Sequence, residues 1–314
     1  IKAVSEHLRR VGLNAHVECA HGRAFRYRVD YLQEKPVMVS LVVPTKGGYD
    51  ALRNICSIVA ETDYPSIEIV LVVDCDLAAR ANESIKAIAP EFPVRIVEVS
   101  GGFRYSKWLN EGAKKAEGSC LVFIHDDIAP CENDWLNVLS GIAMRKDVGA
   151  VGTMTCNADG TIRQAGLSFV RDTIVNLSAG VSSDTPGYIF YPLTTRNVAA
   201  VSGVCLATSQ DAYNAIGGFD EGLVDSYADV DYCFAADSLG LNVVYTPEAR
   251  LTHNCLVDEV SDNIPSLEQV RVSDKATLLH KWSLKISMGD RYCNPNFSKT
   301  PQMAARYRLD TSGL

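Results

Sequence analysis

Uniformly apolar runs alternate with amphipathic segments through the first 130 residues. Four runs, at 37–44, 67–74, 94–100 and 119–127, have the pattern of buried strands. The segments between them, at 51–61, 82–89 and 106–116, have helical periodicity. This alternation predicts an α/β fold with a Rossmann-like, mainly parallel sheet that helices cover on both faces. Ligands of such sheets bind beyond the carboxyl ends of the strands.

The two ends and the second half of the chain carry other patterns. An apolar helical repeat at Val4, Leu8 and Val11 precedes an alternating stretch over 25–31, which predicts a small leading helix and strand that end at Pro36. After about residue 150 the segments become shorter and richer in Gly, Ser and Thr, which predicts a mixed or antiparallel half. A helix over 229–239, a strand over 242–245 and a helix over 269–282 are expected to follow.

These patterns divide the chain into three expected parts. Residues 1–36 form a leading helix and strand segment, and residues 37–265 form the main domain. That domain has a first half at 37–130 and a second half at 131–265. Residues 266–314 form a helical tail with a polar, weakly patterned end.

Composition narrows the class of protein. A chain of 314 residues that is 47% hydrophobic has material for one large domain and is not intrinsically disordered. The net charge of -8 argues against nucleic acid as a partner, because binding phosphates needs a basic face. The ten cysteines form no CxxC pair, which indicates structural thiols in a reducing compartment. We find no apolar stretch long enough to span a bilayer and no signal peptide, so a cytoplasmic protein is expected. The start at Ile1 suggests a fragment of a longer chain.

Polar residues follow the first two strands of the expected sheet. The first strand ends at Pro44 and Thr45, and the second ends at Asp74. A carboxylate at this edge could accept a hydrogen bond from the imide N–H of a pyrimidine base. Acidic residues at strand ends also commonly form turns or helix caps, so both interpretations stay open.

Two adjacent carboxylates, Asp126 and Asp127, follow the fourth strand directly. Side by side at the end of a buried strand they repel each other unless a cation neutralises them. Mg²⁺ or Mn²⁺ held by one or two carboxylates, with a diphosphate and water completing its shell, would do so. The alternative is a solvated loop that leads to a helix cap at Asp134. We expect His125, just before the pair, to pack or to support the site without being a ligand.

A second group of candidate residues lies late in the chain. Asp229 and Asp231 open a helix, where acidic residues commonly serve as caps, but either could act as a general base. His253 follows a short expected strand and is either structural or a ligand of Mn²⁺. Arg104 and Lys107 flank a helix start, which is either an anion site or the ordinary beginning of a surface helix.

Taken in order, these segments resemble glycosyltransferase family 2, the inverting transferases of GT-A fold. The similarity covers residues 37–254. Its segments are VSLVVPTKGGYDALRNICSI, IEIVLVVD, FRYSKWLNEGAKKAEGSCLVFIHDDI, VSGVCLATSQDAYNAIGGFDE and YADVDYCFAADSLGLNVVYTPEARLTH. The resemblance makes 37–130 a nucleotide-binding half and 131–265 an acceptor half.

The resemblance also implies roles for individual residues, and all of them lie in the segments just quoted. The implied roles are base contacts for Pro44, Thr45 and Asp74, a ribose or metal contact for Asp126, the main metal ligand for Asp127, the catalytic base for Asp229, and a third metal ligand for His253 as in galactofuranosyltransferase-like members. Beside these, we expect Arg104 and Lys107 to contact the phosphates of a donor, and Gly203 and Asp231 to lie on the acceptor side.

Three features of the sequence depart from the family pattern. Ala228 stands where members often have an acidic residue before the base, and His125 stands at the first position of a triple-Asp metal motif. Ala235 and Ala236 replace a basic residue after the catalytic helix motif, which puts one acceptor or helix contact in doubt.

The function that the resemblance implies is metal-dependent, inverting transfer of a sugar. The donor would be a UDP-, dTDP- or GDP-linked sugar, and the acceptor a glycan or lipid-linked glycan. The leading segment resembles linkers in large bacterial transferases that build O-antigen or capsular polysaccharide, so other domains of a longer chain are expected partners and could hold the protein at the inner face of the membrane.

Two rival functions stay open. A sugar nucleotidyltransferase should have a Gly-rich basic loop after the first strand, of which Lys46, Gly47 and Gly48 are a thin version. A non-catalytic glycan-binding or scaffold domain of a larger synthase would bind glycan without metal-linked donor affinity. A dinucleotide-dependent dehydrogenase is disfavoured because no GxGxxG opens the first helix.

Overall fold

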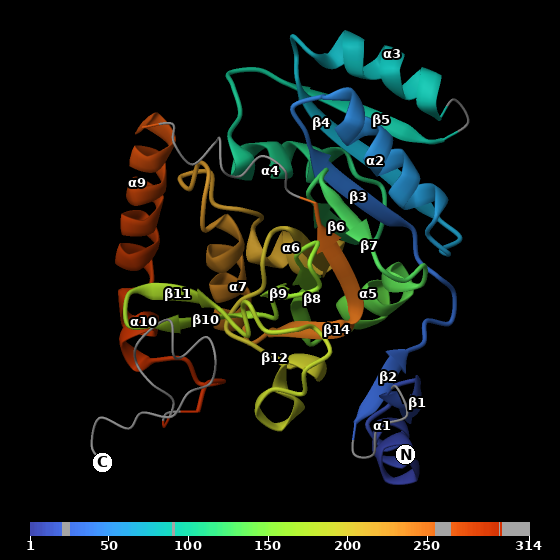
Figure 1. Cartoon of the computed structure of the whole chain (residues 1–314), viewed down its shortest axis with the longest axis vertical. Coiled ribbons are helices and arrows are strands. Elements are labelled where there is room, and N and C mark those ends of the chain that lie inside the picture. Colours follow the sequence, from blue (N-terminus) through green and yellow to red (C-terminus); the bar gives the residue numbers. More distant parts are fainter. Residues whose placement is uncertain (21–25, 90–91, 255–264, 295, 297–314) are drawn as a thin grey trace.

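The computed structural model describes residues 1–20, 26–89, 92–254, 265–294 and 296. In this part of the chain, ten strands form one sheet, whose main path has the order β12-β14-β8-β13-β6-β3-β4-β5, with β7 paired to β14 and β9 to β8 (Figure 1). The sheet is mixed: the strands of its first half are parallel, and those of its second half are largely antiparallel.

The first half is the parallel part. Its elements are β3 (Val39–Pro44), α2 (Tyr49–Ala60), β4 (Ile67–Asp74), α3 (Ala78–Ile88), β5 (Val94–Val99), α4 (Tyr105–Lys115) and β6 (Cys120–Ile124). β3 pairs in parallel with both β4 and β6, and β4 pairs in parallel with β5. The strand order therefore reverses between β3 and β6, and their carboxyl ends flank a topological switch point, where open α/β sheets bind ligands.

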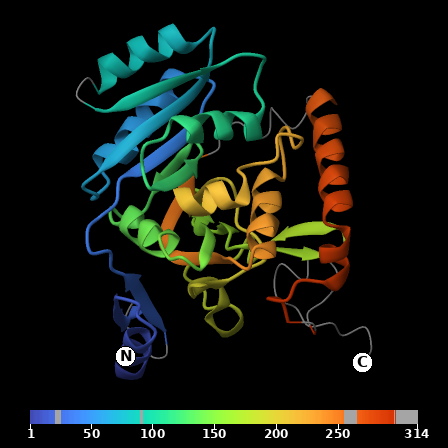
Figure 2. The same ribbon diagram turned by 180° about the vertical axis from the view of Figure 1, so that it is seen from behind.

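Helices cover both faces of the sheet, as the apolar runs predicted. Alternate residues of each strand enter two separate buried clusters. One cluster packs the sheet against α4 and α7, and the other packs it against α2, α3 and α5 (Figure 2). Val42 faces the first cluster and Leu41 the second, which is why both must be apolar.

The second half combines short antiparallel strands with one long strand. Its elements are β7 (Ile128–Pro130), α5 (Trp135–Ala143), β8 (Val148–Cys156), β9 (Ile162–Gln164), β10 (Leu167–Val170), β11 (Thr173–Asn176), η2 (Tyr188–Leu193), β12 (Arg196–Asn197), β13 (Cys205–Ser209), α6 (Gln210–Ile216), α7 (Ala228–Ser238) and β14 (Asn242–His253). β13 is antiparallel to both β6 and β8, and it joins the second half to the first.

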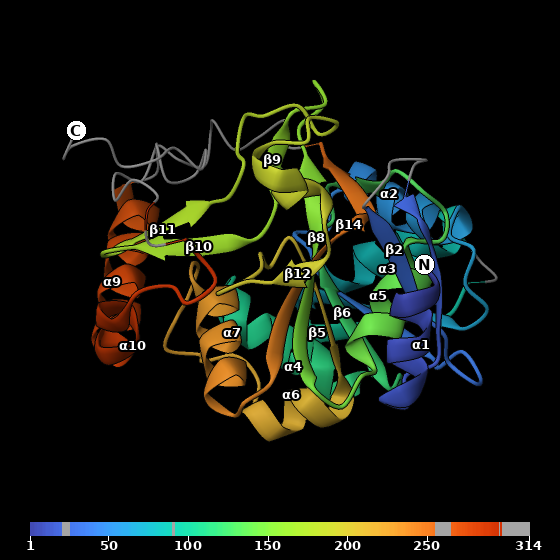
Figure 3. The same cartoon turned by 90° about the horizontal axis from the view of Figure 1, so that it is seen from below.

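Smaller pieces flank the sheet at both ends of the chain. They are α1 (Lys2–Arg10), β1 (Ala15–Cys19) and β2 (Tyr27–Tyr31) at the beginning, and α9 (Pro265–Lys281) and α10 (Ser283–Met288) at the end. α9 and α10 lie beside α7 and the β10–β11 hairpin (Figure 3). Trp282 packs edge-on against Phe234 of α7, with ring centroids 5.7 Å apart.

The structure departs from the sequence expectations in two places. The leading segment has a second strand, β1, which pairs antiparallel with β2, and Phe25 and the end of the tail at 297–314 lie outside the described residues. The strand expected over 242–245 was predicted too short. β14 continues to His253 because its end pairs with β7 and, after an irregularity beyond Thr246, again with β8.

Candidate active site

The carboxyl ends of β3 and β6 are joined by side chains at the switch point. The Thr45 hydroxyl donates to Oδ2 of Asp126 at 2.5 Å. From α2, the amide of Asn54 donates to the carbonyl oxygens of Asp126 and Ile128, at 2.9 and 2.8 Å. The end of β3 and the helix α2 therefore both hold the loop that carries the two adjacent carboxylates. Asn54 was not singled out from the sequence, because an Asn inside a helix gives no signal of such a contact.

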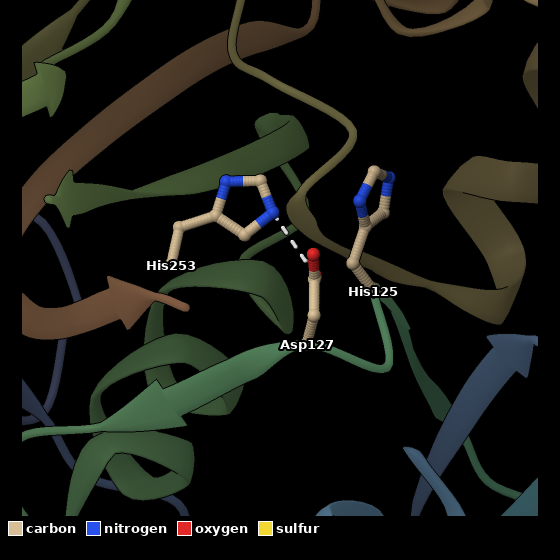
Figure 4. A group of neighbouring side chains, drawn as sticks. All are labelled: His125, Asp127 and His253. Carbon is tan, nitrogen blue, oxygen red and sulfur yellow. Dashed lines mark hydrogen bonds and ion pairs between the residues drawn. The ribbon is translucent and has the colours of Figure 1, made fainter. Parts of the chain in front are cut away.

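The cluster of Asp127, His125 and His253 forms where β14 meets this loop (Figure 4). Pairing of β7 with β14 places His253 opposite Ile128, one residue after Asp127. Nε2 of His253 lies 3.0 Å from Oδ1 of Asp127. The three residues each offer a ligand atom within 4.8 Å of the others, and His253 is 6% exposed. His125, expected to pack or to support the site, therefore lies close enough to the other two residues to contact a shared metal ion.

The two adjacent carboxyl groups have opposite pKa shifts. Burial raises the pKa of Asp126, and the negative charge of Asp127 raises it further. The hydrogen bond from Thr45 opposes this rise without cancelling it. Burial also disfavours the Asp127 carboxylate, but the hydrogen bond and charge of His253, with the charge of His125, outweigh it and lower the pKa. Asp127 is therefore the member of the pair that stays ionised most readily. Asp134 precedes α5, but its carboxylate binds Arg28, not the helix N-terminus.

Asp229 lies in a cavity of about 330 Å³ beside this cluster, and His125 lines the same cavity. The backbone N–H of Gly203 donates to Oδ2 of Asp229 at 2.7 Å, and that of Val230 donates to Oδ1 at 2.8 Å. Burial raises the pKa of Asp229, with these two hydrogen bonds opposing the shift. Tyr227, two residues before Asp229, has a left-handed backbone at φ 65°, which turns the chain sharply into α7.

Asp231 has a different environment, although it is only two residues away. Its carboxylate is 4% exposed, accepts from the indole N–H of Trp282 at 2.7 Å and pairs with the ammonium group of Lys281 at 2.8 Å. Asp231 is not among the residues that line the cavity. Of the two candidate bases, Asp229 faces the cavity and Asp231 connects α7 to the end of α9.

The predicted cationic residues lie around the start of α4. The guanidinium of Arg104, which is exposed, donates to the carbonyl of Glu221 at 2.8 Å. Lys107 is 3.5 Å from the carbonyl of Ser100. Lys46, after β3, lies 5.5 Å from the ring centroid of Phe103, and its charge partly opposes the rise in the pKa of Asp126. Lys46 is thus a further cation on this edge, noted in the sequence only as part of a thin glycine-rich loop.

Asp74 ends β4, next to β3, as expected. Its carboxylate accepts from the backbone N–H of Asp76 at 3.1 Å, which is the turn contact that the alternative interpretation anticipated. The side chain is partly exposed. This position is compatible with either role.

The cavity also contains residues that sequence reasoning missed. Apart from those already named, its lining includes Tyr105, Gln164, Leu167, Ile174, Asn176 and Ser226. They come from α4, β9, the β10–β11 hairpin and the loop before α7. Each is an ordinary residue in a short segment, so only the fold brings them together.

Solved structures show which fold class this is. The mannosyltransferase PcManGT from Pyrobaculum calidifontis, in complex with GDP-Man and Mn²⁺, superposes with a TM-score of 0.52 at 18% identity, over 72% of this chain and 59% of that chain. GalNAc-T7 with UDP, GalNAc and Mn²⁺ superposes with a TM-score of 0.57 at 17% identity, over 72% of this chain and 45% of that chain. The fold is thus the α/β fold of GT-A glycosyltransferases.

The chain belongs to the glycosyltransferase-like family 2, whose family model matches residues 36–272. By family it is a glycosyltransferase, as the resemblance implied. O-antigen biosynthesis protein RfbC from Myxococcus xanthus is 30% identical over 276 residues, which are 85% of this chain and 21% of that protein. The uncharacterized protein y4gI from Sinorhizobium fredii is 26% identical over 310 residues, which are 95% of this chain and 33% of that protein. The chain thus spans a fifth to a third of the length of these relatives.

None of the helices in the described part of the chain combines the length and the apolar character that a membrane span requires.

Proposed function

We propose that the chain transfers a sugar from a nucleotide diphosphate to a hydroxyl of a growing bacterial surface glycan, such as O-antigen or capsule, with inversion at the anomeric carbon and with a divalent metal. One observation carries the proposal. The Asp127, His125 and His253 cluster at the switch point adjoins the cavity that holds Asp229. In this proposal the cluster would hold the metal, and Asp229, in the adjoining cavity, would be the carboxylate base.

The residues of the cluster fit a divalent metal. They combine a readily ionised carboxylate with two imidazoles, brought together from β14 and the loop after β6. Imidazole nitrogen is a ligand for transition-metal ions, whereas Mg²⁺ prefers an all-oxygen shell. The donor set therefore favours Mn²⁺ over Mg²⁺. Asp127 and His253 would hold the ion, with His125 completing the protein ligands.

The donor would lie across the carboxyl ends of β3, β4 and β6. Pro44, Thr45 and Asp74 stand at this edge for the base, and Asp126 for the ribose or the metal. The cations for the diphosphate would be Arg104 and Lys107, with Lys46 nearby. A UDP-, dTDP- or GDP-linked sugar satisfies these contacts, and Asp74 suits the imide N–H of a pyrimidine.

Asp229 would act as the general base. It takes the proton of the acceptor hydroxyl while that oxygen attacks the anomeric carbon from the face opposite the diphosphate. The bond from the anomeric carbon to the diphosphate oxygen breaks, and the configuration inverts. Its raised pKa makes the carboxylate a stronger base than a solvated Asp. A bound metal ion supplies charge neutralisation for the departing diphosphate.

The acceptor would enter the cavity next to Asp229. Amides of Gln164 and Asn176 and the ring of Tyr227 line it, and such groups suit a glycan or the sugar of a lipid-linked glycan. The relation to a protein of O-antigen biosynthesis supports this acceptor class. We place the reaction in the cytoplasm, with further domains of a longer chain as the remaining partners.

The test is release of nucleoside diphosphate from a panel of UDP-, dTDP- and GDP-sugars, each with Mn²⁺, with Mg²⁺ and with a chelator. We expect one donor to be turned over, faster with Mn²⁺ and not at all with the chelator. If no donor releases nucleoside diphosphate and donor affinity does not depend on metal, the proposal is contradicted and a scaffold domain is favoured.

A further inference from the structure

The hydroxyl of Tyr105 connects the two halves of the site. It lies 3.0 Å from the carbonyl oxygen of Gly203 and 3.2 Å from Nε2 of His125. The N–H of the same Gly203 donates to Asp229 at 2.7 Å. One side chain thus reaches both a residue of the metal cluster and the residue that binds the proposed base.

Proton counting fixes the direction of these hydrogen bonds. A carbonyl oxygen can only accept, so the single hydroxyl proton of Tyr105 goes to Gly203. The phenol oxygen then accepts from Nε2–H of His125, which makes neutral His125 the Nε2–H tautomer with its lone pair on Nδ1. In Figure 4 the ring of His125 turns one nitrogen toward His253, and the ring centroids are 5.9 Å apart.

The surroundings of Tyr105 hold it in this role. Its backbone N–H donates to the carbonyl of Val224 at 2.8 Å, which fixes the first residue of α4. Its ring meets that of His125 edge-on, at 5.6 Å and 76°.

We infer that Tyr105 is a positioning residue that sets the tautomer of His125 for metal binding and, through the backbone of Gly203, helps to hold Asp229 in place. The metal role of His125 rests on the proposed function. Removing the hydrogen-bond partner of a metal-binding histidine typically lowers the metal affinity by about 10–100-fold. The same substitution should also lower turnover, because the carbonyl of Gly203 loses a hydrogen bond that holds this residue, whose N–H binds Asp229.

The test compares Tyr105→Phe with Tyr64→Phe. Tyr64 is a matched control, because its hydroxyl also donates to a backbone carbonyl, that of Val37 at 2.8 Å, but does not line the cavity. Mn²⁺ affinity is measured by the EPR signal of free Mn²⁺ at one fixed pH. We expect the dissociation constant to rise about 10-fold or more in Tyr105→Phe and to stay unchanged in Tyr64→Phe. Equal affinity in wild type and both variants would overturn the inference.

A second measurement needs no variant of Tyr105. In ¹⁵N-histidine-labelled, metal-free wild type, the ring nitrogen shifts of His125 report its tautomer, with His125→Asn identifying the signals. We expect Nε2–H; an Nδ1–H tautomer would overturn the inference. Gly203→Ala adds a further check, since its Cβ would lie 3.1 Å from the Tyr105 hydroxyl and 3.4 Å from Cβ of Asp229, and it should also weaken Mn²⁺ binding.

These readouts separate the inference from the proposed function. Mn²⁺ affinity and the tautomer are measured without any nucleotide sugar. A protein that turns over no donor but loses Mn²⁺ affinity in Tyr105→Phe would contradict the transferase proposal and leave the inference standing. Normal turnover with unchanged Mn²⁺ affinity in Tyr105→Phe would overturn the inference and leave the transferase proposal standing.

Discussion

Nε2 of His253 lies 3.0 Å from Oδ1 of Asp127, although 126 residues separate the two in the chain. The contact exists because β14 runs far enough to pair with β7, directly after the loop that holds Asp127. A buried imidazole and a partly buried carboxylate meet at the edge of the sheet where a donor diphosphate would lie. This pair is the basis of the first prediction.

Replacing His253 by Ala should abolish most metal binding. Loss of a ligand from a three-residue set should lower Mn²⁺ affinity by about 100-fold or more. Titration of free Mn²⁺ measures this, with His16→Ala as the control because His16 is an exposed histidine away from the cluster. Mn²⁺ affinity that survives in His253→Ala would show that this residue is not a ligand.

Replacing Asp229 by Asn should remove the base and keep the donor site. The amide cannot take the proton of the acceptor, so kcat should fall by about 10²–10⁴-fold. Mn²⁺ affinity and donor affinity should stay near the wild-type values. Asp211→Asn is the matched control, since Asp211 is also an acidic residue in the first turn of a helix but is exposed. Wild-type turnover in Asp229→Asn would refute the assignment.

Turnover should fall on the acid side at a pH above the range of an ordinary Asp. Burial raises the pKa of Asp229, and only its ionised form is a base. Activity is therefore full above the raised pKa and is lost as the pH falls through it. A pH profile of kcat, at saturating Mn²⁺ and donor, measures the pH at which activity falls on the acid side. An acid limb at about pH 3.9, the value of a solvated Asp, would argue against a buried base.

Asp231 should matter for stability and not for chemistry. Asp231→Ala leaves the indole N–H of Trp282 without its acceptor and Lys281 without one of its two carboxylate partners. We expect a loss of about 1–3 kcal/mol in the free energy of unfolding, measured by urea denaturation. At a temperature where the variant is folded, kcat should stay within about twofold of wild type. A selective rise in KM for the acceptor would instead place Asp231 on the acceptor side, as expected from the sequence.

Asp274 of α9 should support the loop before α7. Its carboxylate is 2% exposed and accepts from the backbone N–H groups of Val224, Asp225 and Ser226, at 3.2, 2.8 and 3.0 Å. Asp274→Ala should cost about 1–3 kcal/mol of stability and also lower turnover, because Ser226 lines the cavity.

The control for Asp274 is Glu268→Ala, an exposed acidic residue on the same helix. Thermal unfolding and nucleoside diphosphate release are measured on both variants. Unchanged turnover in Asp274→Ala would mean that α9 stabilises the domain without shaping the site.

The class of fold and the first half of the site could be predicted from the amino-acid sequence alone. Uniformly apolar runs such as those of β3 and β4 can only be buried on both faces, so they predict a covered parallel sheet. Parallel strands end at one edge, so the positions of Thr45 and Asp126 directly after two of them predict that these residues lie close together. The ordered motifs over 37–254 then indicated the family, which the family model confirms.

What surrounds these residues depends on the tertiary structure. The apolar run at 242–245 ends long before His253. The last part of β14 is a strand because it pairs with β7 and β8, and its own sequence pattern does not predict it. Asp229 and Asp231 have the same local signature, and they differ only in whether the cavity or α9 lies next to the carboxylate. Tyr105 carries no chemical motif, yet its hydroxyl reaches His125, directly after β6, and Gly203, in the turn before β13. Such contacts depend on distances between segments that are far apart in the chain, and local patterning does not encode them.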